Sequence, residues 1–287
     1  MKCIWTLIIF LGVEAAAFTS SLSIKTTSIH TSTQYIEIKR NQENRHKQSF
    51  HLNQSHLKKR RDDRIPPFNS DSTHLQMSPS GIDELPIIYQ SSIFLGIYTM
   101  LSISTIQSIK LIDSLSKGIG LETWRNVFVD KLLPLLLGIL YTTAGIGHFT
   151  NSVAFCSIYP PVGTWGIWYL FGSVDFHVAW TGVVEILGGS GLLVGSVRSL
   201  WNMEDDDDGL VLKLMKPASA VMLFILTVLV TPANIYMYTH GAVMGVDMPP
   251  LDVSFHYIRF VIQVLLLSTL FVLAKDGLFF AWGDELD

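Results

Sequence analysis

Charged residues are scarce in this sequence, and cysteine is almost absent. Of the 287 residues 15% are charged and 49% are hydrophobic, whereas soluble domains carry roughly 25% charge. Cys3 falls in a predicted leader, which leaves Cys156 as the one cysteine of the mature chain. Neither an internal disulfide nor a CxxC redox pair is therefore expected there. No basic stripe with interleaved aromatics accompanies the net charge of -4, so no nucleic-acid partner is expected. This balance favours a membrane protein.

The first part of the chain has the features of a targeting sequence. Eleven of the twenty Lys and Arg residues precede Gly81. Residues 1–17 combine a basic start, an apolar core too short to span a membrane, and the small residues Ala15, Ala16 and Ala17, as signal peptides do. Residues 18–80 are rich in Ser, Thr, His, Asn and basic residues without apolar periodicity, which predicts a disordered, transit-peptide-like region.

The rest of the chain predicts an all-α membrane fold. Residues 131–276 are expected to form a four-helix transmembrane domain, followed by a tail over 277–287, because four nearly uncharged windows reach the ~20 residues that a bilayer requires. These windows are 132–150, 176–197, 217–239 and 253–274. An additional helix over 86–110 precedes them. Its many Ser, Thr and Gln residues leave two alternatives open, a fifth crossing or an amphipathic helix on the membrane surface.

The positions of the cations predict the orientation of the helices. We define side A as the side of the membrane that holds the segment before Leu132, and side B as the other. Lys and Arg in short loops mark one side of a membrane. Eight cations fall on side A: Lys110, Lys117, Arg125, Lys131, Arg198, Lys213, Lys216 and Lys275. The side-B loops 151–175 and 240–252 contain no Lys or Arg, so the four crossings are expected to alternate in direction.

Several polar residues lie inside the predicted spans, and ionisable groups there are functional candidates with a partner. At 1.5 Å per residue, Glu185 lies roughly 12 Å from side B, Asn234 roughly 6 Å, and Arg259 and Gln263 roughly 6 to 12 Å. His148 ends the first of the four spans on the same side. We therefore expect one buried polar layer, in which Glu185 is either neutral from desolvation or ionised against Arg259, the only cation in the four core spans. We favour the ion pair.

A purely structural interpretation of this layer stays open. Buried polar residues can hold helices together without binding a ligand. Asn234 follows Pro232 closely and could use its amide on backbone carbonyls that the proline frees. Glycines beside Glu185, such as Gly182 and Gly189, are expected to let a neighbouring helix approach closely. In the side-B loop 151–175, Trp165 and Trp168 are expected to form a short segment lying on the membrane interface.

Four sequence blocks, in order, resemble the DoxX family of small four-helix membrane proteins. They are Ala144-Gly-Ile-Gly-His-Phe-Thr-Asn151 with Pro160-Pro161, Gly182-Val-Val-Glu-Ile-Leu-Gly-Gly-Ser-Gly-Leu-Leu193, Pro232-Ala-Asn-Ile-Tyr-Met237, and Arg259 followed by Gln263. The resemblance implies a four-helix membrane fold and an association with membrane redox chemistry. It makes His148, Glu185, Asn234 and Arg259 motif positions without assigning a reaction to them.

The leader carries a second resemblance. Ala17-Phe18-Thr19-Ser20-Ser21, with the Ser- and Thr-rich basic stretch that follows, is similar to the bipartite plastid leader of diatoms and related algae. This implies a multi-pass protein of a complex plastid, in the thylakoid or envelope. The alternative is an ordinary signal peptide directing the chain to the endomembrane system or plasma membrane.

Three functions fit these patterns. In the first, the chain is a quinone-linked redox component whose ligand-binding layer is His148, Glu185, Asn234, Arg259 and Gln263. In the second, it is a non-enzymatic membrane protein that binds or carries a small lipophile, or assists assembly of a membrane complex. In the third, two of the side-B helix-end histidines ligate haem or a metal; these are His148, His177, His240 and His256. Neither haem nor a metal is expected, because such histidines are commoner as interfacial residues and no H-E-x-x-H or Glu-x-x-His spacing accompanies them.

Overall fold

The computed structural model describes residues 78–118, 125–201, 210–245 and 249–283. All regular structure in these segments is helical, as the sequence predicts. The predicted signal peptide, nearly all of the predicted leader and the acidic run at 204–208 lie outside the described residues. The elements are η2 (Ile82–Glu84), α3 (Ile87–Gly118), the π-helical η3 (Arg125–Leu132), α5 (Leu133–Thr150), α6 (Ser152–Ser157), η4 (Thr164–Gly166), α7 (Val174–Leu200), α8 (Leu210–His240) and α9 (Val253–Gly283).

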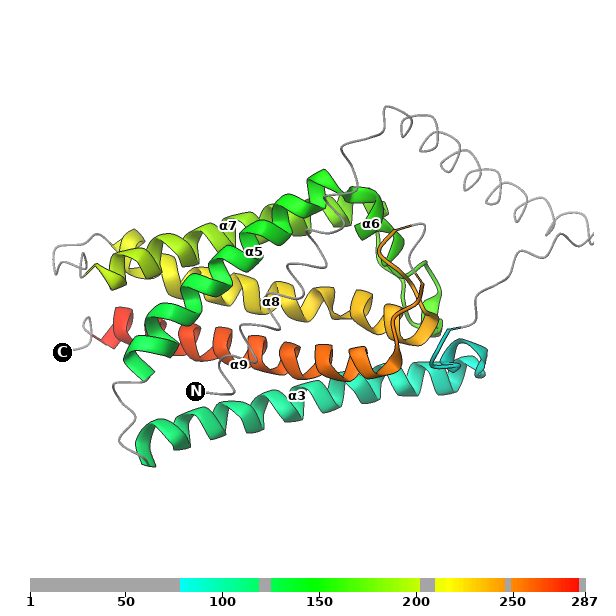
Figure 1. Ribbon diagram of the computed structural model, residues 1–287, viewed down its shortest axis with the longest axis horizontal. Coiled ribbons are helices and arrows are strands. Elements are labelled where there is room, and N and C mark those ends of the chain that lie inside the picture. The colour runs from blue at the N-terminus through cyan, green and yellow to red at the C-terminus, as the bar shows by residue number, and fades with distance from the viewer. Residues whose placement is uncertain (1–77, 119–124, 202–209, 246–248, 284–287) are drawn as a thin grey trace, which may run out of the picture. The chain divides into compact units, whose positions relative to one another are not determined.

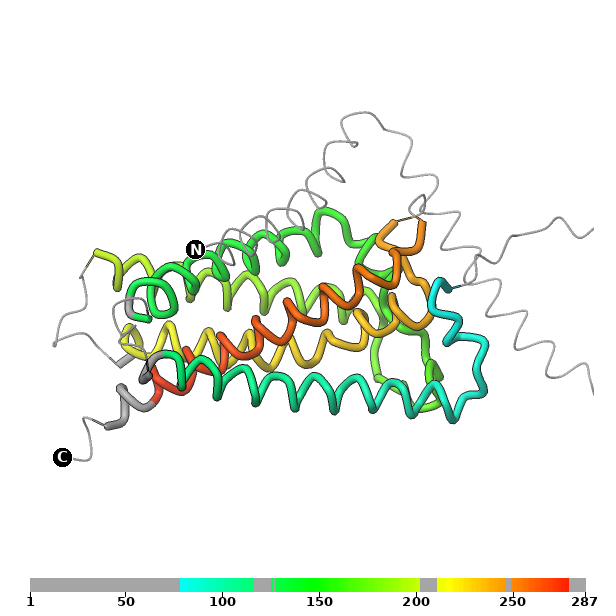
Figure 2. The backbone as a smooth tube through the Cα atoms, turned by 60° about the horizontal axis from the view of Figure 1, so that its bottom comes forward, coloured from blue at the N-terminus to red at the C-terminus, as the bar shows by residue number. Residues whose placement is uncertain are grey.

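Five of these helices are long and apolar enough to cross a membrane. They are α3, α5, α7, α8 and α9, and they lie side by side in Figures 1 and 2. Successive helices run in opposite directions: the end of α7 contacts the start of α8 at Gly195 and Lys216, and the end of α8 contacts the start of α9 at Gly241 and Pro250. The architecture is that of a multi-pass membrane protein.

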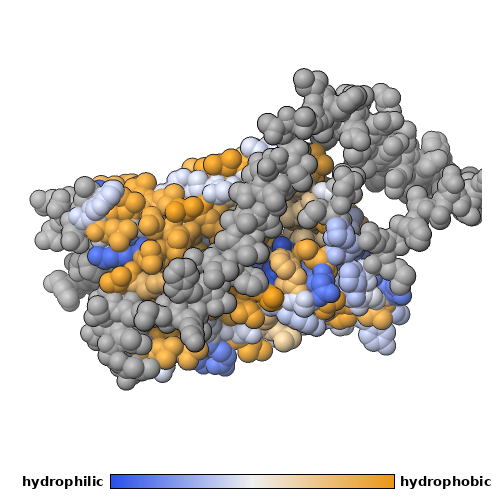
Figure 3. Space-filling model, viewed as in Figure 1, coloured by the Kyte–Doolittle hydropathy of each residue, from blue (hydrophilic) through white to orange (hydrophobic). Residues whose placement is uncertain are grey.

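The core of the bundle lies where α5, α7, α8 and α9 meet. Each helix contributes fully or nearly fully buried apolar side chains, among them Leu137, Leu192, Leu223 and Leu270. Lipid is itself apolar, so burying apolar side chains does not by itself drive helices together in a membrane. Close van der Waals packing between the helices must therefore hold the bundle together. On the visible outer surface, Figure 3 shows wide apolar areas, which suit helices that face lipid.

α3 lies along α9 for much of its length. Leu101 packs against Val264 and Leu267 of α9, and the Ser268 hydroxyl donates to the carbonyl of Thr105 at 3.4 Å. Near side A, Lys275 at the end of α9 pairs with Asp113 of α3 at 3.5 Å. A helix lying flat on the membrane surface would cross the bundle instead, so this arrangement fits a fifth crossing. The helix extends from Ile87 to Gly118, beyond the predicted end at residue 110.

α8 begins and continues differently from the prediction. It starts at Leu210 and runs through both Pro217 and Pro232 to His240, so neither proline ends the helix. Pro232 has no N–H to donate to the carbonyl of Val228, four residues earlier. The Tyr98 hydroxyl of α3 donates to that carbonyl at 3.1 Å instead. α3 thus satisfies the backbone group that the proline frees, and the helix needs no break there.

The loop between α6 and α7 buries Trp165 rather than laying it on the interface. Trp165 is 0% exposed and its indole Nε1 donates to Thr239 of α8 at 3.1 Å. Phe94 of α3 packs against it with ring centroids 4.5 Å apart. Its backbone φ of 54° is left-handed, an uncommon conformation for a residue with a side chain. The expected interfacial position is wrong for Trp165, because the loop turns inward.

Candidate functional site

Glycines bring α5 and α7 into backbone contact at the level of the polar residues. A Cβ added to Gly145 would lie 2.7 Å from the carbonyl oxygen of Gly182. A Cβ added to Gly182 would lie 2.7 Å from the Cβ of His148. Real side chains do not approach so closely, so only glycine fits at these positions. The predicted packing role of the glycines is confirmed here, and the close approach places His148 opposite Glu185.

His148 and Glu185 form a buried pair. The Nε2 of His148 lies 3.4 Å from Oε2 of Glu185, and both residues are 8% exposed. The other ring nitrogen of His148, Nδ1, lies 2.8 Å from the carbonyl oxygen of Val178. A carbonyl can only accept, so Nδ1 carries a hydrogen and donates to it.

This hydrogen-bond pattern places a shared proton between the two side chains. With Nδ1 protonated, a neutral imidazole presents a lone pair at Nε2, and an ionised carboxylate also presents only lone pairs. Two acceptors facing each other in a buried site would repel. The pair is therefore stable with one proton between Nε2 and Oε2, held either by the carboxyl or by an imidazolium. The proton can shift between Nε2 and Oε2 without leaving an unpaired buried charge, whereas its release leaves the pair with a buried negative charge.

The surroundings of the pair are nearly closed. Phe155 of the short helix α6 stacks on the imidazole of His148, with ring centroids 3.8 Å apart. The Thr181 hydroxyl lies 3.2 Å from Nδ1. Apart from the 3.4 Å contact with His148, Oε2 of Glu185 lacks a hydrogen-bond partner among the described residues, and Oγ1 of Thr142 at the same helix interface also lacks one. Buried polar atoms without a partner are rare, and each needs an explanation.

Asn234, Gln263 and Arg259 lie in a second group, between α8 and α9. Asn234 Nδ2 donates to Gln263 Oε1 at 3.4 Å. Gln263 Nε2 donates in turn to the hydroxyl of Thr231 at 2.5 Å. Arg259 Nη1 lies 2.9 Å from the sulfur of Met237, and its guanidinium lies over the ring of Phe255, 5.3 Å from the centroid.

The expected ion pair between Glu185 and Arg259 is therefore wrong. Within the described residues, the ion-pair partner of Glu185 is His148. Glu185 faces α5 because the glycines of α5 and α7 draw those two helices together. The expectation that Asn234 uses its amide on a carbonyl freed by Pro232 is also not met, since Tyr98 occupies the carbonyl of Val228 and Asn234 bonds to Gln263.

Some hydroxyl groups that were not predicted as site residues lie between the His148–Glu185 pair and the α8–α9 group. The hydroxyls of Tyr141 on α5 and Thr227 on α8 are 2.6 Å apart, and both residues are buried. Thr231 follows Thr227 by one helical turn and accepts from Gln263. The sequence does contain a signal for the α8 residues, because the spacing of Thr227, Thr231 and Asn234 places them on one face of a helix. Tyr141 offered no such signal.

The side-B histidines other than His148 each have local partners. His177 Nε2 donates to the carbonyl of Phe171 at 2.7 Å while its Nδ1 accepts from the indole of Trp180 at 3.1 Å. His240 bonds to Thr239 at 2.8 Å, and His256 packs against Tyr238. No group of three or more His, Cys, Asp or Glu residues placed to hold a metal ion occurs in the part of the chain that the structure describes.

Cys156 is half-buried on side B, outside the long helices. Its sulfur lies 3.7 Å from a carboxylate oxygen of Asp175. Burial, and then the negative charge and hydrogen bond of Asp175, raise the pKa of the Cys156 thiol to about 11. At neutral pH the thiol stays protonated, and so it is a poor nucleophile.

The fold and the site together define a multi-pass helical membrane protein with a buried pair formed by His148 and Glu185. Comparisons of the sequence with models of protein families and with curated proteins, and of the structure with solved structures, found no match.

Proposed function

We propose that this protein is a DoxX-like, quinone-linked component of a membrane redox system, in which the Glu185–His148 pair exchanges a proton with the quinone. The observation that supports it best is the buried Oε2 of Glu185, which lies 3.4 Å from His148 Nε2 and has no other hydrogen-bond partner among the described residues. A quinone takes up two protons and two electrons as it becomes a quinol. The pair would donate its one proton to a quinone oxygen, take up a replacement from side B and donate that as the second proton, and a partner protein of the same membrane complex would supply the two electrons.

Phe155 is the side chain that must move for a ligand to reach the pair. It covers the imidazole and belongs to a helix of only six residues, Ser152–Ser157. A short helix has few internal hydrogen bonds and opens easily. The approach to the site would then come from side B, where α6 lies.

The test is quinone binding by the purified protein and quinone reduction by the isolated membrane complex that contains it. Glu185→Gln keeps the shape but removes the exchangeable proton, and we expect the reaction to slow by on the order of 10²–10⁴, the range for loss of a general acid–base. Thr142→Val, a change at the same helix interface, is the matched control and should leave the rate within a few-fold. Protein that retains no quinone, and whose quinone binding is unchanged by Glu185→Gln, would overturn the proposal.

A second function is favoured by the α8–α9 group. The amides of Asn234 and Gln263 bond to one another and to Thr231, as in a structural brace. In this case the protein would be a non-enzymatic binder or carrier of a small lipophile, or an assembly factor of a membrane complex. Ligand retention without electron transfer would support the carrier, and co-purification with a membrane complex at fixed stoichiometry would support the assembly factor.

We also propose that the protein resides in a complex plastid, in the thylakoid or envelope membrane. The support is the resemblance of residues 17–21, and of the Ser- and Thr-rich stretch after them, to the leader that directs proteins there. A fluorescent fusion at the C-terminus should co-localise with chlorophyll in a diatom. Replacing Phe18 by Ala should move it to the endomembrane system, and an unchanged endomembrane or plasma-membrane signal from the unaltered fusion would contradict the proposal.

A further inference from the structure

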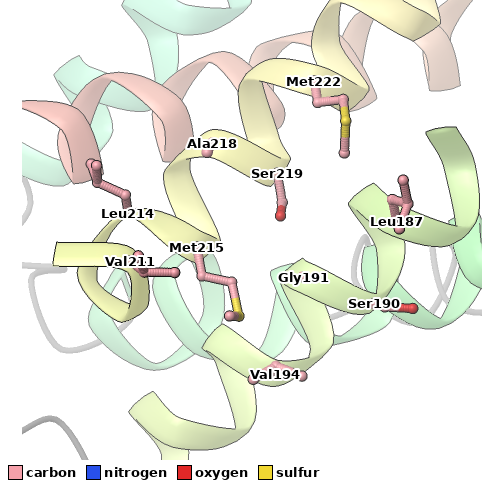
Figure 4. A pocket seen from close by; sticks show the side chains of 10 residues that line it. All are labelled: Leu187, Ser190, Gly191, Val194, Val211, Leu214, Met215, Ala218, Ser219 and Met222. Atoms are coloured by element: carbon pink, nitrogen blue, oxygen red, sulfur yellow. The ribbon is translucent and has the colours of Figure 1, made fainter. Parts of the chain in front are cut away.

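A groove lies between α7 and α8, on the side-A half of the bundle and away from the polar residues described above. Figure 4 shows side chains of both helices around it. Its volume is about 560 Å³, within the ~300–1,000 Å³ of ligand pockets. The lining is Leu187, Ser190, Gly191 and Val194 from α7, and Val211, Leu214, Met215, Ala218, Ser219 and Met222 from α8.

The lining is suited to hydrocarbon. Among its residues only Ser190 and Ser219 carry a polar side chain, and none is titratable. The floor is formed where the two helices meet, since a Cβ added to Gly191 would lie 2.0 Å from the hydroxyl oxygen of Ser219. Met215 and Met222 add flexible, polarisable side chains that adapt to a ligand's shape.

The length of the groove matches one leaflet of a bilayer. Along α8 it runs from Val211 to Met222, which is about 16 Å at 1.5 Å per residue. The hydrocarbon core of a bilayer is ~30 Å thick, so one leaflet supplies ~15 Å. A single acyl chain lying parallel to the helices would fill this length.

The two ends of the groove differ, and the difference sets the orientation of its ligand. At the side-A end, Val211 is 76% exposed, and Lys213 lies exposed beside it. At the mid-membrane end, Leu223 packs into the notch at Gly188, where an added Cβ would lie 2.6 Å from its side chain. The polar part of a ligand must therefore lie at side A and its apolar part must point to the middle of the membrane.

We propose that this groove binds one acyl chain of a phospholipid from the side-A leaflet as a resident lipid. The length of the groove favours a phospholipid, because one acyl chain spans one leaflet, ~15 Å, which matches the length that the groove provides along α8. The proposal is independent of the redox function, since the groove and the His148–Glu185 pair lie on different faces of α7.

The test uses a phospholipid with a photoreactive diazirine at the end of its acyl chain, incorporated in vesicles with the full-length protein. We expect cross-links concentrated on residues 187–194 and 211–222. Ala218→Trp, which fills the groove, should lower cross-linking there on the order of tenfold, equivalent to about 1.4 kcal/mol of binding. Ile225→Trp is the control, because Ile225 is exposed on the same face of α8, two turns beyond Ala218 and outside the groove.

Equal labelling of all the lipid-facing helices would show bulk lipid only and overturn the proposal. Retention of a prenylated quinone in the groove, in place of phospholipid, would also overturn it. If Ala218→Trp does not fold, as judged by its thermal unfolding, Ser190→Phe blocks the groove from α7 and should give the same loss of labelling.

Discussion

His148 and Glu185 stabilise one another only as a pair. Removing one partner of a buried ionisable pair costs about 3–5 kcal/mol, whereas replacing both by apolar residues is often nearly neutral. We expect His148→Leu to destabilise the protein strongly, and His148→Leu with Glu185→Leu to recover most of that loss. Unfolding in detergent, followed by tryptophan fluorescence, measures both variants. Strictly additive losses would contradict the shared proton.

Cys156 provides a pH-dependent measurement at the residue scale. Its pKa of about 11 lies above the ~8.5 of an ordinary thiol, so the reactive thiolate is depleted below pH 11 and increases as pH rises toward that value. We expect alkylation of the folded protein at pH 8 to be roughly two orders of magnitude slower than for an ordinary thiol. Asp175→Asn should lower the pKa and speed the reaction at pH 8. A rate that stops rising near pH 9 in the unaltered protein would contradict this assignment.

At the scale of elements, the α5–α7 contact depends on glycine. A Cβ at Gly182 would lie 2.7 Å from the Cβ of His148, so Gly182→Ala must push the helices apart. We expect a loss of about 1–3 kcal/mol, as for overpacked cores, together with altered quinone chemistry at the pair. Gly96→Ala on α3 is the control, since a Cβ there meets no atom within 4 Å. Equal effects of the two changes on thermal unfolding would exclude the packing argument.

The contact of Tyr98 with Val228 couples α3 to the proline in α8. Tyr98→Phe removes the hydroxyl that donates to the carbonyl of Val228, so that carbonyl loses this hydrogen bond. We expect the change to lower the stability of the protein by about 1–3 kcal/mol. In a Pro232→Ala background the helix can supply its own N–H to that carbonyl, so the same Tyr98→Phe change should cost less. A double-mutant cycle on thermal stability tests this coupling. A coupling near zero would show that α3 only packs against α8 through apolar contacts.

At the scale of the whole molecule, the charges at the two ends predict the topology. The side-A ends carry Arg125 paired with Asp276, and Lys275 paired with Asp113. The side-B segments of the described chain carry acidic residues and no Lys or Arg. Helices of alternating direction therefore present all their basic loops to the side from which they insert.

Cysteine labelling of sealed, uniformly oriented vesicles measures this topology. In a background lacking Cys3 and Cys156, Phe171→Cys reports on side B and Trp201→Cys on side A, since the two native side chains are 97% and 68% exposed. An impermeant maleimide should label only one of them until detergent is added. Labelling of both in intact vesicles would contradict the predicted crossings.

Most of the fold could be predicted from the sequence. The predicted windows 132–150, 176–197 and 253–274 fall within the membrane-spanning helices of the structure, because a bilayer imposes both length and apolar composition on a span. Element ends were less accurate: α8 begins seven residues before the predicted Pro217, and α9 continues to Gly283, past the predicted domain end at 276. Prolines mark helix ends in water, whereas neighbouring helices can satisfy the freed carbonyl in lipid.

From the sequence alone it can be predicted that the chain is helical and apolar, which way its helices run, and which polar residues lie inside them. Each of these follows from local composition and from the positions of charges along the chain. Only the tertiary structure decided the partners, pairing Glu185 with His148, Asn234 with Gln263 and Tyr98 with the carbonyl of Val228. Depth along a helix can be counted in residues, but the direction in which a side chain points depends on which helices pack together, and here the glycines of α5 and α7 set that packing.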